Sequence, residues 1–467
     1  MRNSKKLQKI KEIVNSVRWQ EVKEEAVELL RKLIRIDTTN PPGNEKEAAE
    51  LLSKYFSEYG IESQIVESEP QRSSVIANLE GKKDLKPIIL LSHLDVVPAN
   101  PSEWRFPPFS GEVKDGYIWG RGAIDCKGLA VVEAVAMTLI KRSGIKPDRG
   151  IKFISVADEE MGGEKGAKYV VENLDIDGFG VLNEGGTGVV LGNRKIYMPC
   201  FGEKGPLWLK IKAKGKPGHA SMPHKDNPNL ILVQALYKIL KSDLGKKLSD
   251  GFISSAKFYL LDNKKSLSGL KLLLSLIEKS DFAKEILGKA LSSLFYMLNK
   301  NKLSAMFSNT LSVTIMKSGY KENVIPEEAE AILDIRILPG YDHDEIIERM
   351  RKIVDDPRVS FEIISVYEPS QSNPVSDFMI LLKEATSAVF ETAFFPILAT
   401  GFTDSRFFRK KGIPAYGFFP FFLTDEDLST MHGIDERISI ENIELGLKLM
   451  LAIILHICTE ENSLLGL

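Results

Sequence analysis

The feature that most constrains the fold is an alternation of short apolar runs with longer amphipathic runs between residues 87 and 183. The run PIILLS at 87–92 is uncharged and almost wholly apolar, which is typical of a strand buried on both faces. The elements predicted after it are a helix at about 127–142, a strand at about 150–157, a helix at about 164–173 and a strand at about 179–183. This order predicts an α/β fold with a mixed, largely parallel sheet.

The pattern changes near Gly205. In LWLKIKAK, at 207–214, apolar and charged or aromatic residues alternate, so this strand is expected to have one buried and one solvated face. With predicted helices at about 228–241 and 343–354 and strands at about 310–317, 329–338 and 359–366, the order becomes β-α-β-β-α-β. That order predicts a ferredoxin-like α+β domain at 205–368, inserted between α/β segments at 1–204 and 369–467.

One segment of the insertion, at about 245–305, does not fit the ferredoxin-like pattern. It is rich in Leu, Ser, Phe and Lys, and LKLLLSLIEK and ILGKALSSLFYML within it are typical of amphipathic helices. Extra helices packed on the inserted domain are the favoured interpretation. A membrane-facing surface or a lid over the substrate are the alternatives.

Composition excludes several classes of protein. The net charge is -2, from 62 basic and 64 acidic residues, so no global field attracts the chain to nucleic acid or anionic membranes. Three widely spaced cysteines argue against a disulfide framework and favour the cytoplasm. Lysines interrupt any apolar stretch in the basic N-terminus, so this segment is not expected to be a secretory signal. No uncharged apolar run is long enough for a membrane span.

Candidate metal ligands follow the predicted strands. His93, Asp125, Glu160 and Glu184 lie at or after strand ends, and His432 lies in a distant loop. Each has an ordinary explanation when taken alone, such as a hydrogen-bonded pair for His93 and Asp95 or solvent exposure for the acids at 158–160. The carboxyl ends of parallel strands meet at one edge of a sheet, so together they predict a metal site. Mixed histidine and carboxylate ligands suit zinc and, less well, cobalt or manganese.

The ordered motifs SHLDVVP, GRGAIDCKG, DEEMGG, NEGG, GKPGHASMPH, NVIP, DIRILPG, GFTDSRF and MHG resemble those of one enzyme family. It is the dinuclear zinc family of aminoacylases, acetylornithine deacetylases, succinyl-diaminopimelate desuccinylases and glutamate carboxypeptidases. The likeness is greatest to its Gly-Xaa carboxypeptidase and N-acyl-amino-acid hydrolase branch. The resemblance implies a zinc-exopeptidase-like catalytic domain formed by the two α/β segments, and a lid and dimerisation domain formed by the insertion.

The resemblance also implies roles for single residues. Asp125 is expected to bridge two zinc ions, with His93 and Glu184 completing one site and Glu160 and His432 the other. Glu159 is the expected general base. Asp95 is expected to orient His93, a role that their spacing along a strand also favours. A cis peptide is expected between Asp125 and Cys126, and no role is expected for the thiol.

Further expectations concern the substrate and the oligomer. In a homodimer, His219 is expected to cross the interface and stabilise the oxyanion in the partner's site. The extra helices at 245–305 could instead cover that face and let one chain act alone. Asn323 and Arg406 match positions that contact the substrate carboxylate or the oxyanion. Arg336 matches less well, and an ion pair with Asp334 is the alternative.

The expected activity is metal-dependent hydrolysis of an amide bond in a small substrate with a free carboxylate, an N-acyl amino acid or a short peptide. No nucleic acid partner is expected. A biosynthetic deacylase acting on acetylornithine or succinyl-diaminopimelate is one alternative. An inactive metal-binding scaffold is another, but it would be expected to lose the base, and Glu159 and Asp95 are both present.

Overall fold

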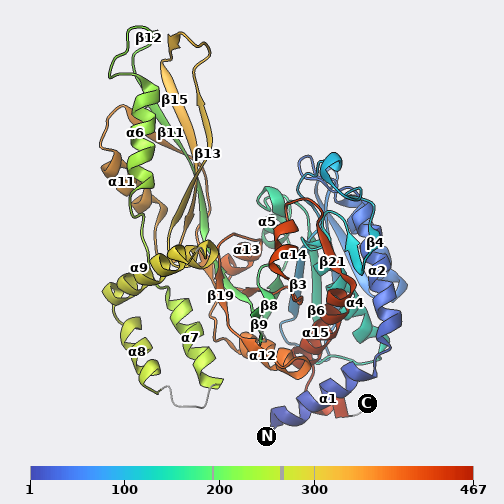
Figure 1. The fold of residues 1–467 in the computed structure, drawn as a ribbon. Coiled ribbons are helices and arrows are strands. Elements are labelled where there is room, and N and C mark those ends of the chain that lie inside the picture. The colour runs from blue at the N-terminus through green and yellow to red at the C-terminus, as the bar shows by residue number, and fades with distance from the viewer. Residues whose placement is uncertain (1, 192–193, 263–267, 299, 466–467) are drawn as a thin grey trace. The chain divides into compact units, whose positions relative to one another are not determined.

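A computed structural model describes residues 2–191, 194–262, 268–298 and 300–465 (Figure 1). The chain divides into two compact units. The first comprises Met1–Phe201, Ser372–Ile397 and Thr403–Leu467, and the second comprises Gly202–Gln371 with Leu398–Phe402. Each unit has its own sheet and its own covering helices.

The first unit is built on a mixed sheet, which agrees with the predicted fold class. Among the described residues its strands follow the order β1-β2-β6-β3-β7-β20-β10, and β10 continues into the second unit, where it pairs with β17. Pairing is parallel along β6-β3-β7-β20 and antiparallel on either side. These strands are β1 (Glu62–Glu69), β2 (Arg72–Leu79), β3 (Ile88–His93), β6 (Ile151–Val156), β7 (Gly180–Asn183), β10 (Cys200–Glu203), β17 (Ser370–Gln371), β19 (Ile397–Ala399, paired with β10) and β20 (Ala415–Gly417).

Helices cover both faces of this sheet, which is why every residue of β3 is buried. On one face Ile89 and Leu91 of β3 pack with Val170 and Phe408, which belong to helices α5 and α13. The helices of the first unit are α1 (Arg2–Ser16), α2 (Trp19–Arg35), α3 (Lys46–Glu58), α4 (Lys127–Arg142), α5 (Ala167–Asn173), α12 (Asp377–Val389), α13 (Ser405–Lys410), α14 (Asp425–Thr430), α15 (Ile440–Cys458) and α16 (Glu461–Leu465), with short 3₁₀ turns at Pro101–Glu103 and Glu159–Met161.

Two small sheets complete the first unit. Strand β21 (Arg437–Ser439) pairs with β5 (Tyr117–Trp119) and β5 with β4 (Glu112–Lys114), and β18 (Ala393–Phe394) pairs with β9 (Arg194–Met198) and β9 with β8 (Thr187–Leu191). Pairing of β21 with β5 ties the C-terminal part of the chain to the segment that precedes Asp125. None of the described helices has the length and hydropathy of a membrane span.

The second unit has the predicted ferredoxin-like topology. Its described residues form an antiparallel sheet in the order β13-β15-β11-β16, and helices α6 and α11 lie against it (Figure 1). The apolar positions of β11 (Leu207, Leu209, Ile211, Ala213) are fully buried beneath these helices, as their alternation predicts. The elements are β11 (Gly205–Lys214), α6 (Pro228–Leu240), β13 (Thr310–Ser318), β15 (Glu328–Ile337), α11 (His343–Val354) and β16 (Val359–Val366), with a short ladder of β12 (Gly218–His219) and β14 (Val324–Ile325).

The segment at 245–305 forms helices, as predicted, and belongs to the second unit. Part of that prediction, residues 263–267 and 299, lies outside the described residues. The aromatic rings of Phe252 and Phe295 each pack against Phe307, with ring centroids 4.9 and 6.0 Å apart. The helices are α7 (Asp250–Asp262), α8 (Ser268–Glu278), α9 (Asp281–Met297) and α10 (Asn301–Ala305).

Candidate metal centre

The carboxyl ends of the parallel strands bring the predicted ligands of the first unit together. His93 is the last residue of β3, Glu160 lies in the 3₁₀ turn that follows β6, and Glu184 follows β7 directly. Asp125 precedes α4, and His432 follows α14. Because β6, β3 and β7 are parallel neighbours, their ends lie at the same edge of the sheet.

Asp125 lies between two groups of candidate ligands. Its Oδ1 is 3.0 Å from Nε2 of His93, which is also 3.8 Å from Oε2 of Glu184. Its Oδ2 is 3.2 Å from Nε2 of His432, which is 3.3 Å from Oε2 of Glu160. The two oxygens of one carboxylate thus face two histidines. The peptide bond between Asp125 and Cys126 is cis, as the resemblance implied.

The charges of this cluster are not balanced by the protein. Burial, together with the repulsion of neighbouring carboxylates, raises the pKa of Glu159 and Glu160 and raises that of Glu184 to about 8. Hydrogen bonds to Asp125 and Glu160 raise the pKa of His432 to about 10. Buried carboxylates that repel one another are stabilised by cations, and one oxygen of Glu160 is buried with no hydrogen-bond partner among the described residues. This donor set therefore fits divalent metal ions.

The thiol of Cys126 lies close to the group formed by His93, Asp125 and Glu184. Burial raises the pKa of this thiol well above its usual value. Since the thiolate is the form of cysteine that binds metals, Cys126 is a poor candidate ligand in this setting.

Asp95 acts on several groups of the site at once. Its backbone carbonyl lies 3.0 Å from Nδ1 of His93, and its carboxylate lies 3.5 Å from the same atom. These acceptors favour a proton on Nδ1, which leaves the lone pair of Nε2 directed at Asp125. The Asp95 carboxylate also accepts from the backbone N–H groups of Glu159 and Glu160, at 3.0 and 3.1 Å. Asp95 thus contacts the histidine and both glutamates, which is more than its spacing from His93 indicates.

A buried network behind Asp95 was not predicted from sequence. Asn40 donates to Asp95 at 2.8 Å and to Asp158 at 3.2 Å. The guanidinium of Arg72 pairs with Asp158 and Glu45, both at 2.8 Å. Asp158 has a left-handed backbone, with a φ of 71°, immediately before Glu159. The available sequence signal is the TTNPPG motif at 38–43, which contains Asn40.

A second unpredicted residue, Glu436, joins two distant loops. Its carboxylate accepts hydrogen bonds from Arg121 at 2.8 Å and from the backbone N–H groups of Gly122, Ile124 and Asp125 at 2.9 to 3.0 Å. Arg121 also donates to the carbonyl of Gly433, at 2.7 Å. The loop before Asp125 and the loop after His432 are therefore held by one buried ion pair. The available signal was its position four residues after His432 in MHGIDE.

Arg406, on α13 of the first unit, is buried. Its guanidinium donates to the carbonyl of Thr403 at 3.0 Å and to that of Gly162 at 2.6 Å. Gly162 follows the 3₁₀ turn that holds Glu159 and Glu160. In this structure Arg406 therefore supports the turn that holds Glu159 and Glu160.

The remaining predicted residues lie in the second unit. His219 and Asn323 are exposed neighbours, because β12 and β14 pair and the Ala220 N–H donates to the Asn323 carbonyl at 3.0 Å. Arg336 on β15 makes a two-pronged ion pair with Asp334, at 2.7 and 2.9 Å, which is the structural alternative considered above.

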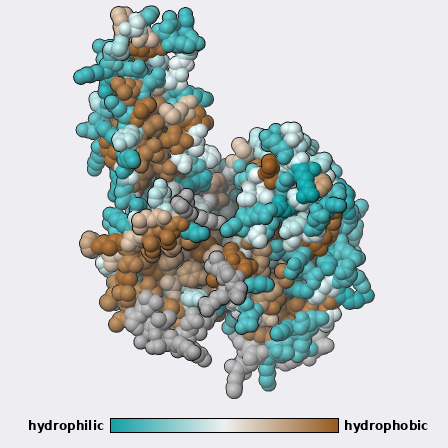
Figure 2. Space-filling view, in the orientation of Figure 1, coloured by the Kyte–Doolittle hydropathy of each residue, from teal (hydrophilic) through white to brown (hydrophobic). Residues whose placement is uncertain are grey.

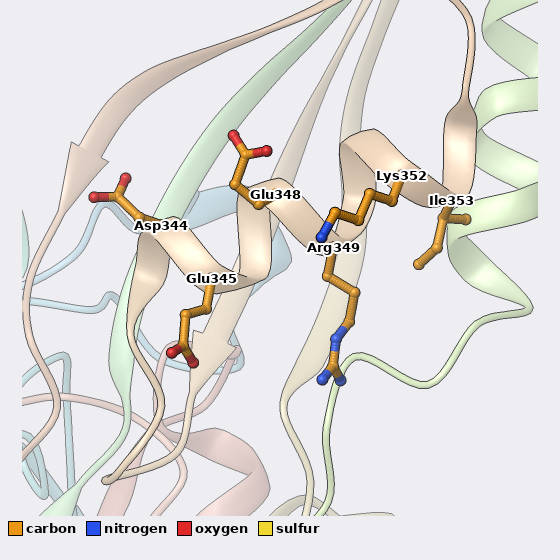
Figure 3. A pocket seen from close by; sticks show the side chains of 6 residues that line it. All are labelled: Asp344, Glu345, Glu348, Arg349, Lys352 and Ile353. Carbon is orange, nitrogen blue, oxygen red and sulfur yellow. The ribbon is translucent and has the colours of Figure 1, made fainter.

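A surface depression in the second unit is unrelated to these residues. Figure 3 shows that its side chains all come from α11: the charged Asp344, Glu345, Glu348, Arg349 and Lys352, and the apolar Ile353. Side chains of a single helix form no enclosed binding site, and we assign no function to it.

Comparison with known proteins identifies the family. The profile of peptidase family M20/M25/M40 matches residues 89–456. The N-fatty-acyl-amino acid synthase/hydrolase PM20D1 of Xenopus tropicalis is 31% identical over 441 residues, covering 91% of this chain and 84% of that protein. A probable carboxypeptidase S-like 2 of Dictyostelium discoideum is 32% identical over 386 residues, covering 79% and 71%.

The fold is also similar to that of a solved M20 structure. The metallo-carboxypeptidase Sso-CP2 of Sulfolobus solfataricus, an M20 family protein, superposes with a TM-score of 0.68 at 20% identity, covering 92% of this chain and 99% of that one. The resemblance found from the motifs is thereby confirmed. This chain belongs to peptidase family M20/M25/M40 and is a metal-dependent hydrolase of amide or peptide bonds.

Proposed function

We propose that this chain cleaves an N-acyl amino acid, or the C-terminal residue of a short peptide, at a centre of two zinc ions. The observation that carries the proposal is Asp125, whose two oxygens face two separate groups of ligands. His93 and Glu184 would hold one ion. Glu160 and His432 would hold the other, with Asp125 shared between them. Cobalt or manganese could replace zinc in such a ligand set.

Glu159 is the proposed general base. It is half-buried beside Glu160 and lies outside both groups of candidate ligands. Burial and the charge of Glu184 raise its pKa, which suits a group that takes up a proton and releases it again. Two bound divalent ions would lower the pKa of a water molecule towards about 7 and polarise the substrate carbonyl. Glu159 would take the proton of that water and deliver it to the leaving nitrogen, a contribution of about 10²–10⁴ in rate.

His219 is proposed to stabilise the oxyanion in the site of a partner copy. The backbone N–H of Ser221 donates to Nδ1 of His219 at 3.2 Å, so Nδ1 is an acceptor. A neutral imidazole with an acceptor at Nδ1 carries its proton on Nε2. That Nε2–H group is exposed and can donate to a developing negative charge. Asn323 beside it is the proposed second polar contact.

A homodimer supplies the partner that this role of His219 requires. Helix α6 exposes an apolar stripe along one side, with Leu230, Val233, Tyr237 and Leu240 between 44% and 64% exposed. Strand β13 lies at an edge of the sheet and can pair with a second copy. A two-fold axis through these elements would give the commonest form of oligomer.

Arg406 is the proposed partner of the substrate carboxylate, with Arg336 as a weaker candidate because Asp334 already engages it. Guanidinium and carboxylate match in shape and charge. The relatives support a substrate of this kind, since one is named for N-fatty-acyl amino acids and another as a carboxypeptidase.

The proposed location is the cytoplasm. The three cysteines, Cys126, Cys200 and Cys458, are all among the described residues, and each is buried as a thiol. A reducing compartment is the usual environment of proteins with such cysteines.

A hydrolysis panel tests the proposal. The zinc-loaded and cobalt-loaded protein is given N-acyl amino acids with short and long acyl groups, dipeptides with free or amidated C-termini, N-acetylornithine and N-succinyl-diaminopimelate. We expect cleavage of substrates with a free carboxylate and a large loss of kcat/KM on amidation. Preference for the last two compounds would identify a biosynthetic deacylase. If no compound is cleaved, the inactive metal-binding scaffold is the interpretation that remains.

Chelation provides the second arm of the test. Removal of metal should abolish turnover, and zinc or cobalt should restore it. Full activity in protein that contains no metal by elemental analysis would contradict the proposal.

A further inference from the structure

The helices α8 and α9 of the second unit expose several large apolar side chains. Figure 2 shows hydrophobic residues gathered over α7, α8 and α9 on the face turned to the viewer. We define the α8–α9 apolar face by six residues that are between 45% and 74% exposed: Leu272, Leu276, Phe282, Ile286, Leu294 and Met297. Single exposed apolar residues are ordinary, but a set of this size on adjacent helices marks a contact surface.

On α9 the most buried positions are small or polar, although the half-buried positions include apolar residues such as Phe295. Lys284, Gly288 and Ser292 recur every four residues and are buried. Phe282, Ile286, Leu294 and Met297, on the other side, are exposed. The usual surface helix keeps its large apolar residues on the inward side, so exposure of these four is a departure from that pattern.

Specific contacts fix this orientation of α9. The ammonium of Lys284 pairs with Asp250 of α7 at 2.6 Å, and the hydroxyl of Ser292 is 3.0 Å from that of Ser304 on α10. At Gly288 the backbone of Lys247 is so close that a Cβ would lie 2.6 Å from it. Rotating α9 to bury its apolar side would break all three contacts. These contacts therefore fix the rotation of α9 that exposes the α8–α9 apolar face.

The charge of the segment indicates what this face contacts. Residues 245–305 contain eleven lysines, no arginine and five acidic residues, an excess of six positive charges, whereas the whole chain has a net charge of -2. The exposed Lys279 follows α8, and Lys289, 53% exposed and 3.9 Å from a carboxylate oxygen of Asp243, lies one turn from Ile286 on α9. Two acids of α9, Asp281 and Glu285, are exposed as well, so the positive excess belongs to the segment as a whole. Exposed aliphatic and aromatic side chains flanked by lysines are the composition of helices that lie in the surface of anionic membranes.

We propose that the α8–α9 apolar face is a docking surface for an anionic lipid bilayer. The apolar side chains would enter the boundary between headgroups and acyl chains, while the lysines extend along the surface to the headgroup phosphates. The chain would bind peripherally, since α8 and α9 have 11 and 17 residues and lie on the surface of their unit. The proposal stands on this surface alone and does not depend on the substrate.

Vesicle flotation tests the proposal on the full-length, metal-loaded chain. We expect binding to vesicles of phosphatidylcholine with phosphatidylglycerol, little binding to phosphatidylcholine alone, and release by high salt. The double variant Phe282→Ser with Met297→Ser should weaken binding about tenfold or more, because the inserted apolar area is lost. Tyr320→Ser, at a side chain 83% exposed elsewhere in the second unit, is the matched control and should bind like wild type.

A charge variant separates the electrostatic contribution of the lysines to vesicle binding from that of the inserted apolar side chains. Lys279→Glu with Lys289→Glu should reduce binding to anionic vesicles, and Lys352→Glu on the exposed side of α11 should not. Circular dichroism establishes that each variant is folded. Equal binding of wild type and the Phe282 and Met297 variant would overturn the proposal. So would a change in oligomeric state in that variant without any vesicle binding, which would identify a second copy as the occupant. A raised KM for a long-chain substrate, again without vesicle binding, would overturn it in favour of an acyl-chain site.

Discussion

The substitution Glu436→Gln tests how the metal centre is held together. The carboxylate of Glu436 accepts three backbone hydrogen bonds and one from Arg121, and it is fully buried. Glutamine keeps the shape but loses the charge and replaces one acceptor oxygen with a donor. If its carbonyl remains on Ile124 and Asp125, its NH₂ group faces the donors of Arg121 and Gly122.

The size of the effect follows from those contacts. A buried donor left without an acceptor costs about 1–3 kcal/mol, and breaking one partner of a buried ion pair costs about 3–5 kcal/mol. Because these terms describe the same contacts and do not add, we expect a loss of about 3–5 kcal/mol in the free energy of unfolding of the first unit. Displacement of the loops carrying Asp125 and His432 should also weaken metal binding by about 10–100-fold.

The assay measures both quantities separately. Denaturant unfolding gives the stability, and competition with a chelator at a temperature where the variant is folded gives the zinc dissociation constant. Glu426→Gln is the matched control, since Glu426 is 78% exposed and pairs with Arg437 at 2.5 Å. It should change stability by less than about 0.5 kcal/mol. If Glu436→Gln binds zinc like wild type, the argument that this residue positions the centre is wrong.

Three further predictions concern catalysis, assembly and pH. Glu159→Gln should lower kcat by about 10²–10⁴ with the metal content unchanged by elemental analysis, and a loss of metal instead would make Glu159 a ligand. Mixing His219→Ala with Glu159→Ala, each nearly inactive, should restore activity in heterodimers, because half of their sites combine an intact Glu159 with the neighbour's His219; verified heterodimers that stay inactive would exclude a shared site. Burial lowers the pKa of Lys204 to about 7, so the unfolded chain binds more protons between about pH 7 and pH 10, and stability should rise with pH across that window. Lys204→Met should remove up to about 1.4 kcal/mol per pH unit of that slope in unfolding experiments, and identical slopes in variant and wild type would contradict the assigned pKa.

The sequence by itself determined which elements form and where the candidate ligands lie. The short unbroken apolar run PIILLS favours a strand buried on both faces, and His93 follows that run directly. Parallel pairing then brings His93 next to the residues that follow β6 and β7. The alternation in β11 likewise fixed which side of the second sheet is buried. These features follow from local periodicity, which can be read along the chain.

Only the tertiary structure revealed the groups that support the ligands. Arg121 and Glu436 are 315 positions apart, and Arg72 and Asp158 are 86 apart, so no local pattern pairs them. From the sequence alone, a charged residue is expected to be exposed, because the partner that would allow its burial cannot be identified. The roles of Glu436 and Arg72 therefore could not be predicted from their surroundings in the chain.

The orientation of helix α9 is a second feature that its sequence pattern alone did not determine. Its sequence predicts an amphipathic helix, but the period of a pattern does not say which side faces inward. The contacts of Lys284, Gly288 and Ser292 with α7, the backbone at Lys247 and α10 turn these three residues inward and leave four large apolar residues of α9 exposed. Periodicity is a property of one helix, whereas burial depends on what packs against it. The apolar face proposed here to meet a membrane thus became visible only in three dimensions.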